Sequence, residues 1–148
     1  MKKSIVVFLF LILAGLYFYQ SFVSKKGQEA LPVNQPTNTV IYATDQRPGP
    51  SVIINFASLS KSGYIVIQED DNGKLGRILG NSAVIPKGES RSIFVGLIRP
   101  SVNGESLLAV MYDDSGDKVF SPNIDVPVKD ESGNIIFTKF LIDRNAAK

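Results

Sequence analysis

The stretch GYIVIQEDDNGKLGRILG, residues 63–80, decides the fold class of this chain. Successive side chains of an extended segment point to opposite sides, so the first half of this stretch assigns its own faces. Ile65 and Ile67 share one side, and the other side holds Tyr64, Val66 and Gln68. Asp71-Asn72-Gly73 follows, and these residue types reverse a chain at low steric cost. The pattern predicts two antiparallel strands joined by a tight turn.

Short runs rich in Val, Ile and aromatic residues continue on both sides of this hairpin, with turn residues between them. The predicted strands are residues 39–44, 51–57, 63–69, 77–85, 92–99, 106–112, 118–121 with 125–128, and 134–143. No window longer than about ten residues in this part of the chain has the apolar spacing of an amphipathic helix. We therefore expect an all-β domain over residues 37–148, an immunoglobulin-like antiparallel β-sandwich of seven or eight strands.

An apolar segment precedes this domain. Residues 4–24 contain no charged side chain, and Lys2-Lys3 and Lys25-Lys26 bracket them. As a helix the segment would reach about 31 Å, close to the hydrocarbon core of a bilayer at about 30 Å. We expect residues 1–24 to form an uncleaved signal-anchor, one N-terminal transmembrane helix with the N-terminus inside the cell. A cleaved signal peptide is the alternative, because a basic start and an apolar run also fit one.

Residues 25–36 (KKGQEALPVNQP) are polar and contain two prolines, which predicts an extended linker. The four lysines around the apolar segment account for the basic balance of the whole chain. Residues 37–148 keep 12 basic and 13 acidic side chains, whereas the complete chain has a net charge of +2. We expect a single-pass protein of the cell membrane that contacts the bilayer through residues 4–24 and carries its C-terminal domain extracytoplasmically.

The composition excludes several classes of site, because the chain has no His, no Cys and no Trp. It therefore has no Cys/His zinc site, no Ser-His or Cys-His nucleophile and no disulfide. The sequence also lacks a glycine-rich phosphate loop and a basic stripe interleaved with aromatic residues, so no nucleic-acid partner is expected. A glycosidase carboxylate pair is a further alternative, although a small domain without Trp offers little to build a sugar cleft.

Acidic side chains gather in two places in the predicted domain. One cluster is Glu69-Asp70-Asp71, and the second is Asp113-Asp114 with Asp117, followed by Asp125. Adjacent carboxylates repel, and a bound Ca²⁺ with about six to eight oxygen ligands removes that cost. Asp114, Asp117 and Asp125 are the candidate metal ligands, because the bend at residues 121–123 can return Asp125 to the turn. Solvated turns without a metal are the alternative, since Asp, Asn, Ser and Gly are common in turns.

Three stretches carry a resemblance to a family: GYIVIQEDDNGKLGRILGNSAVIPKG at 63–88, LLAVMYDDSGDKVFSP at 107–122 and IDVPVKDESGNIIFTKF at 124–140. They resemble an uncharacterised β-sandwich domain-of-unknown-function family of archaeal surface proteins and exported proteins of small-genome bacteria. The matching positions, within residues 50–143, are Gly63, Tyr64, Val66, Gly80, Ser82, Gly88, Glu89, Asp114, Gly116, Asp117, Phe120, Asp125 and Pro127. Gln68 and Tyr112 stand where the family usually has histidines. The resemblance implies the fold and a cell-surface setting, and it implies no chemistry.

These features together lead to an expected function. We expect a membrane-anchored extracytoplasmic surface module with a structural or interaction role, no catalysis, and an envelope or surface component as its partner. The expectation depends on one anchor, one linker and one β-domain without the residue types that nucleophilic catalysis by Ser-His or Cys-His pairs needs. A carbohydrate- or peptide-binding module, with Ca²⁺ as a stabilising ion, is the alternative.

Overall fold

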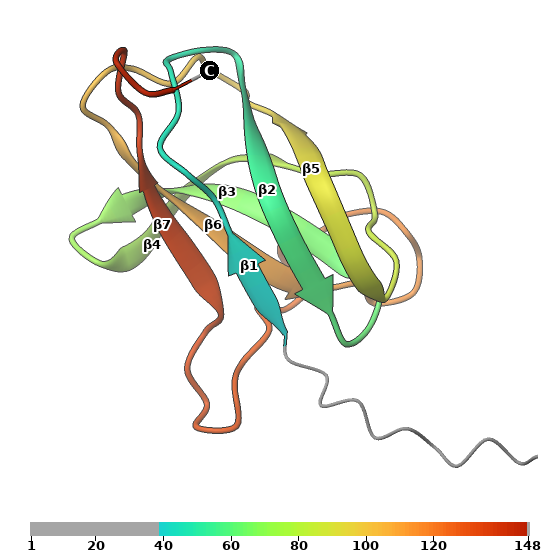
Figure 1. The fold of residues 1–148 in the computed structure, drawn as a ribbon. Helices are drawn as coiled ribbons and strands as arrows, with labels where there is room; N and C mark the ends of the chain where they lie inside the picture. Colours follow the sequence, from blue (N-terminus) through green and yellow to red (C-terminus); the bar gives the residue numbers. More distant parts are fainter. Residues whose placement is uncertain (1–38, 148) are drawn as a thin grey trace, which may run out of the picture. The chain divides into compact units, whose positions relative to one another are not determined.

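The structure is a computed structural model, and it describes residues 39–147. Seven strands assemble into two antiparallel sheets, one in the order β1-β2-β5 and one in the order β4-β3-β6-β7 (Figure 1). The strands are β1 (Val40–Tyr42), β2 (Ser51–Leu59), β3 (Gly63–Asp71), β4 (Lys74–Asn81), β5 (Gly88–Gly96), β6 (Ser106–Asp113) and β7 (Phe137–Leu141). The prediction of an all-β domain with antiparallel sheets is confirmed.

The predicted membrane helix at residues 4–24 and the linker at 25–36 lie outside the described residues, as does the predicted start of the domain at residue 37. Residues 39–147 contain no helix. This part of the chain therefore has no helical segment with the length and apolarity to cross a bilayer.

The hairpin of β3 and β4 is the one that the opening stretch predicts. Its two central residues, Asn72 and Gly73, have φ values of 54° and 84°. Positive φ at both positions defines the type I′ turn, whose twist matches that of the flanking strands. Asp71 pairs with Lys74 directly across the turn, so both strands extend closer to the turn than the apolar pattern alone predicts.

The main hydrophobic core lies between the two sheets. Ile54 and Val95 reach it from the three-stranded sheet, and Ile65, Ile67 and Leu107 reach it from the four-stranded sheet. All five side chains are completely buried. Burial of one such side chain contributes about 1.5–3 kcal/mol, so this layer stabilises the domain. The predicted common face of Ile65 and Ile67 is confirmed.

The outer face of the four-stranded sheet is also buried. Tyr64, Val66, Leu108 and Val110 form a second cluster there, on the side of β3 and β6 that turns away from the main core. The connection between β6 and β7 covers them, and its Phe120 packs against the cluster. The chain itself therefore covers this apolar face.

One predicted strand, residues 118–121 with 125–128, is wrong. These residues belong to the irregular connection between β6 and β7 and touch the sheet through isolated bridges such as Tyr112 with Pro127. Pro122 and Pro127 lack the N–H that a ladder needs at every second residue. Lys118 has a φ of 62°, which breaks the extended conformation. The apolar residues of this segment therefore pack on the sheet without joining it.

Candidate metal centre in the loop after β6

The loop over residues 114–127 begins where β6 ends, beside the turn between β2 and β3. The main-chain N–H of Asp114 donates to the Ser62 carbonyl oxygen at 3.1 Å, which fixes the start of the loop. One oxygen from each of Asp114, Asp117 and Asp125 lies within 4.8 Å of the other two. The fold thus brings the three predicted carboxylates together, although Asp125 is separated from Asp114 by a complete bend.

Asp125 is the buried member of this acidic triad, with only 2% of its surface exposed. One carboxylate oxygen accepts the N–H of Ser115 at 2.9 Å, and the other accepts the N–H of Ser121 at 2.7 Å. The Ser121 bond, followed by the Ser115 bond, lowers the pKa of Asp125 against the opposing effect of burial. Asp125 therefore stays ionised and ties the two halves of the loop together.

Asp114 and Asp117 organise the tip of the loop in the same way. A single oxygen of Asp114 accepts the N–H groups of Gly116 and Lys118, both at 3.1 Å. Asp117 accepts the N–H of Val119 at 2.9 Å. Such bonds from Asp to nearby main-chain donors define local turns, and they offset part of the repulsion among the carboxylates.

Tyr64 joins the triad to the sheet. Its hydroxyl donates to Asp114 at 3.3 Å, and the residue is 1% exposed. Burial first, and then the charge of Asp114, raise the pKa of Tyr64 to about 12. Phe120 meets the rings of Tyr64 and Tyr112 edge-on, with centroids 5.4 and 5.5 Å apart. These aromatic contacts hold the loop against the outer face of β3 and β6.

The chemistry of the triad fits a hard cation. Its side-chain ligands are all oxygens, which Ca²⁺ prefers. Oδ1 of Asp114 already accepts three bonds, so the acceptor capacity left for an ion lies on its Oδ2, on the second oxygen of Asp117 and on the two oxygens of Asp125, which accept one N–H each. Three carboxylates are fewer than the roughly six to eight ligands that Ca²⁺ takes, so main-chain carbonyls and water would complete the shell. The same N–H bonds also stabilise the loop without an ion.

In the other predicted acidic cluster, Glu69 to Asp71, the first two acids are paired with protein cations. Glu69 accepts bonds from Arg99 at 2.7 Å and from Arg77 at 2.9 Å, and Asp70 pairs with Lys139 at 2.6 Å. The bond from Arg99 lowers the pKa of Glu69 most, and the bond from Lys139 lowers the pKa of Asp70 most. Within residues 39–147 these three acids do not form a metal-ligating group.

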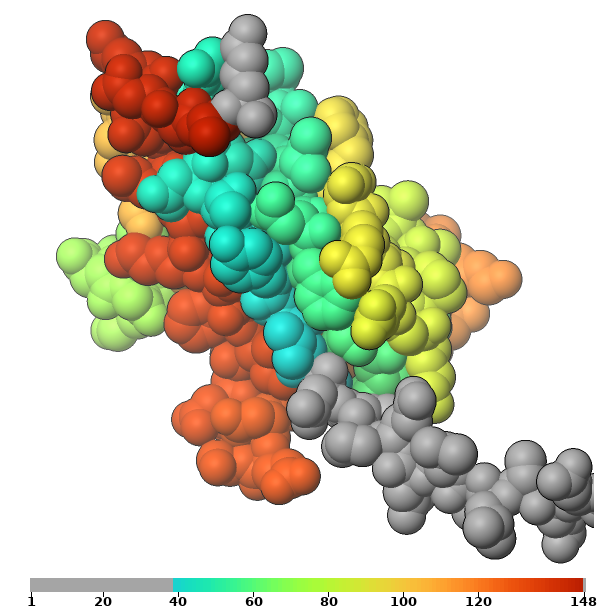
Figure 2. All heavy atoms as spheres, viewed as in Figure 1, coloured from blue at the N-terminus to red at the C-terminus, as the bar shows by residue number. Residues whose placement is uncertain are grey.

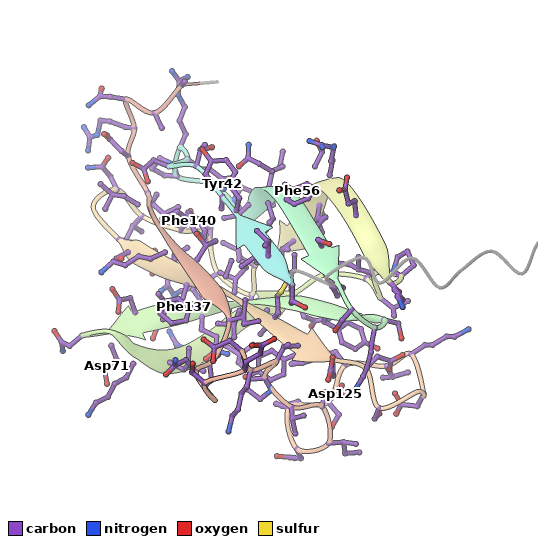
Figure 3. The ribbon with its side chains drawn as sticks, turned by 60° about the horizontal axis from the view of Figure 1, so that its bottom comes forward. Tyr42, Phe56, Asp71, Asp125, Phe137 and Phe140 are labelled. Atoms are coloured by element: carbon purple, nitrogen blue, oxygen red, sulfur yellow. The ribbon has the colours of Figure 1, made fainter. Side chains whose placement is uncertain are left out.

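The two acidic clusters lie at opposite ends of β3. Gly63 at its start pairs with Asp113, and Asp71 is its last residue; Figure 3 shows Asp71 and Asp125 on opposite sides of the molecule. A nine-residue strand spans about 26 Å, far beyond the roughly 5–10 Å between the two carboxyl groups of a glycosidase. A carboxylate pair drawn from both clusters therefore does not meet that geometry.

Sequence reasoning missed the partners of the triad. It did not include the Tyr64 hydroxyl or the main-chain N–H groups of Ser115 and Ser121. The spacing Asp114-x-Gly116-Asp117 is a signal for consecutive Asp turns and could have indicated the loop-forming role. The contact of Tyr64 with Asp114 has no such signal, because the two residues are 50 positions apart.

Comparison with known proteins adds a family match. A family model with the description "Domain of unknown function (DUF7282)" matches residues 38–142. The match covers β1 to β7 and the whole acidic loop. No curated protein and no solved structure matches the chain.

Proposed function

We propose a function for this chain on the premise that it belongs to the family described as a domain of unknown function (DUF7282). The chain is a membrane-anchored, extracytoplasmic interaction module without catalytic activity. The lysine-bracketed apolar segment at residues 4–24 supports the anchor, and the resemblance to exported surface proteins supports the extracytoplasmic setting. The partner is another component of the cell envelope or surface.

The observation that supports an interaction role is the difference between the two outer sheet faces. The connection between β6 and β7 covers the outer face of the four-stranded sheet. On the three-stranded sheet, Tyr42, Ile53 and Phe94 are 54%, 49% and 64% exposed. Neighbouring exposed apolar side chains on one sheet face are typical of a surface that binds something.

The strand order supports a finer fold assignment, and we infer an immunoglobulin-like arrangement from it. Constant-type immunoglobulin domains pair their first, second, fifth and fourth strands in one sheet and the remaining three in the other. Here β1, β2 and β5 form the first sheet, and β4 pairs with β3 beside β6 and β7. The arrangement differs by the transfer of the fourth strand to the opposite sheet. Immunoglobulin variable domains, which share this sandwich architecture, use the loops at one end of the sandwich for recognition.

The orientation of the chain provides the test of the proposal. The natural chain has no Cys, so one introduced thiol reports one position. Lys87→Cys places it at an exposed site beside β5, and Ser4→Cys places it at the predicted inner boundary of the anchor. We expect a membrane-impermeant maleimide to label K87C in intact cells and S4C only after permeabilisation.

Two results of this experiment would contradict the proposal. Labelling of K87C only after lysis would place the domain inside the cell. Recovery of K87C in the soluble fraction, together with loss of the S4C thiol from the mature chain, would identify a cleaved signal peptide. The matched pair therefore separates an anchored protein from a secreted one.

The acidic triad favours a second candidate, a module stabilised by Ca²⁺. Three converging carboxylates, one of them buried, form its proposed site. A cation bound only by the folded state raises the Tm by mass action. We expect about 5 mM Ca²⁺ to raise the Tm by a few degrees relative to chelator. Differential scanning calorimetry of the full chain in detergent measures the shift.

The control for the Ca²⁺ experiment uses two exposed aspartates. Asp117→Asn removes the most exposed ligand of the triad, and Asp71→Asn changes the other acidic cluster. The shift disappears in D117N and remains in D71N if the triad binds the ion. An unchanged Tm in the natural chain, or an equal shift in both variants, rejects the site.

A further inference from the structure

The exposed face of the sheet β1-β2-β5 has an ordered arrangement of apolar side chains. Tyr42 on β1 lies directly opposite Phe56 on β2, and Ile53 on β2 lies directly opposite Phe94 on β5. The Arg91 guanidinium stacks over the Phe56 ring, 4.9 Å from its centroid. Figure 2 shows the three strands side by side on the face toward the viewer. The face is thus a platform of aromatic and aliphatic side chains with one cation on it.

Two hollows adjoin this platform. The first has a volume of about 320 Å³, and its lining includes Asp45, Asn55 and Ile53. The second has a volume of about 560 Å³, and its lining includes Val84 and Phe94. Because Ile53 and Phe94 are opposite each other in register, they separate the two hollows. A ligand crossing the strands would therefore pass from a polar hollow over an apolar ridge to a second hollow, whose lining mixes apolar side chains with Ser82, Ser90 and Arg91.

The polar hollow presents hydrogen-bonding groups that the protein leaves available. Asn55 uses its Oδ1 to accept two bonds from Thr44, and among the described residues no acceptor binds its Nδ2 amide. Asp45 uses one carboxylate oxygen for the Leu141 N–H, and Arg47 uses only its Nε, which donates to Ala146. One amide, one carboxylate oxygen and the guanidinium ends remain available to a ligand.

The charge around the polar hollow is balanced. Its lining has one acid, Asp45, and one base, Arg47. In the other hollow the single charged side chain is Arg91, which is paired with Glu89 at 3.8 Å. A polyanion or polycation gains little from such a surface, because attraction to one charge is offset by repulsion from its neighbour. The charge pattern therefore favours a neutral ligand.

The edge of β5 argues against an extended peptide as the ligand. A peptide that adds to a sheet needs a regular row of main-chain groups on the edge strand. In β5, Ser92 has a φ of 51°, and the pairing with β2 passes from Arg91 to Ile93 without it. Asn55, which the register places opposite Ser92, is left out of the pairing as well, and an edge strand interrupted in this way is a poor template for strand addition. A ligand of this surface is therefore expected across the face rather than along the edge of β5.

A neutral sugar chain meets all of these requirements. A pyranose ring presents C–H groups on its faces, which pack on aromatic and aliphatic side chains, and hydroxyl groups around its edge, which bind amide, carboxylate and guanidinium groups. From this match we propose that the outer face of β1-β2-β5 binds a neutral glycan chain, with Tyr42, Ile53 and Phe94 beneath its rings and Asn55 at its hydroxyls. The inference rests on the proposed interaction function and names the ligand class.

Retention on polysaccharides tests this inference. The full chain in detergent is passed over microcrystalline cellulose, chitin, mannan and amylose as neutral probes and over heparin as an anionic probe. We expect retention on at least one neutral polymer that persists at about 0.5 M NaCl, where exposed charges are screened. Tyr42→Ala with Phe94→Ala should weaken this binding at least about tenfold. Ile98→Ala, at a residue that is 74% exposed outside the face, is the matched control.

A second variant tests the polar part of the site. Asn55→Asp keeps the oxygen that accepts the Thr44 bonds and replaces the available amide with a carboxylate. We expect unchanged Tm and weaker retention. Absence of retention on all neutral polymers, equal retention of Y42A/F94A and I98A, or salt-sensitive retention on heparin alone would overturn the glycan proposal. The K87C and S4C labelling is independent of these results, so the two proposals fail separately.

Discussion

Asp125 joins two separate segments of its loop, because its two carboxylate oxygens accept N–H groups from both of them. Ser115 lies near the start of the loop and Ser121 lies on the bend. A neutral amide of the same shape offers one acceptor and places N–H groups where the second acceptor was. One of the two part-buried main-chain donors, the N–H of Ser115 or of Ser121, then loses its acceptor, which is costly.

The first prediction follows for Asp125→Asn. We expect the Tm of the full chain, measured in chelator, to fall by about 5 °C or more. Asp117→Asn is the matched control, because Asp117 is exposed and accepts a single bond at the loop tip. Thermal melts followed by circular dichroism measure both. Equal Tm values for D125N and D117N would show that Asp125 does not organise the loop.

Tyr64 leads to the second prediction at this scale. Its pKa is raised to about 12 in the folded protein, above its ordinary value of about 10. The contribution of the neutral Tyr64 side chain to the free energy of unfolding is therefore complete below pH 10 and is lost as the pH rises through 12. Tyr64→Phe removes the ionisable group and should lessen the loss of stability above pH 10. Urea denaturation at pH 8 and 11 measures the free energy of unfolding of the variant and of the natural chain. The same loss of free energy between the two pH values in both proteins would contradict this prediction.

At the scale of elements, the crossing of β4 over the end of β5 depends on glycine. A Cβ added at Gly80 would fall well inside contact distance of the Gly96 carbonyl oxygen. The Ile98 N–H donates to the Leu79 carbonyl oxygen at 2.7 Å, so the two segments meet through their backbones. The two sheets approach each other at this edge only because no side chain stands between them.

The third prediction is that Gly80→Ala separates these backbones. We expect a loss of about 2–3 kcal/mol in the free energy of unfolding, because backbone rather than a flexible side chain must move. Gly49→Ala is the matched control, since the nearest atom to its added Cβ is the Ser51 carbonyl oxygen at an ordinary 3.8 Å. Urea unfolding measures both variants. A G80A variant as stable as G49A would show that the crossing adapts freely.

Sequence reasoning placed the elements well where the signal is local. Positive-φ residues such as Asn72 and Gly73 mark a turn by their own chemistry, and alternation around Ile65 and Ile67 marks an inward face. The segment around Val126 was wrongly predicted to be a strand, because an apolar run next to turn residues fits both a strand and a loop that packs on a sheet. The prolines at 122 and 127 are the local signal that argues against a strand.

At the scale of the whole molecule, ionised acids stabilise both ends of the domain. Glu69 and Glu105 have lowered pKa values chiefly because of bonds from Arg99, and Asp70 because of a bond from Lys139. Asp125 has a lowered pKa chiefly because of the Ser121 N–H. An acid whose pKa is lowered in the folded state makes its full contribution to stability above its unfolded pKa of about 4. That contribution is lost as the pH falls through the folded pKa.

The fourth prediction is therefore an acid-sensitive fold. We expect the urea midpoint to be constant from pH 8 to about pH 5 and to fall steadily between about pH 4 and pH 2. Arg99→Gln should reduce this fall, because it removes the donor that lowers the pKa of two of these acids. A midpoint that is the same at pH 7 and pH 3 would contradict the assignment of these ion pairs.

The sequence by itself determined what depends on neighbours along the chain. It determined most of the antiparallel strands, the inward face of β3, the tight turns and the three acids that meet in one loop, because alternation, turn chemistry and short-range bends are local properties. The tertiary structure alone decided which outer face is covered. Phe120 covers the four-stranded sheet, while Tyr42 and Phe94 stay exposed on the three-stranded sheet. The physical reason is that the path of a long connection depends on contacts between residues far apart in the chain, such as Tyr64 with Asp114.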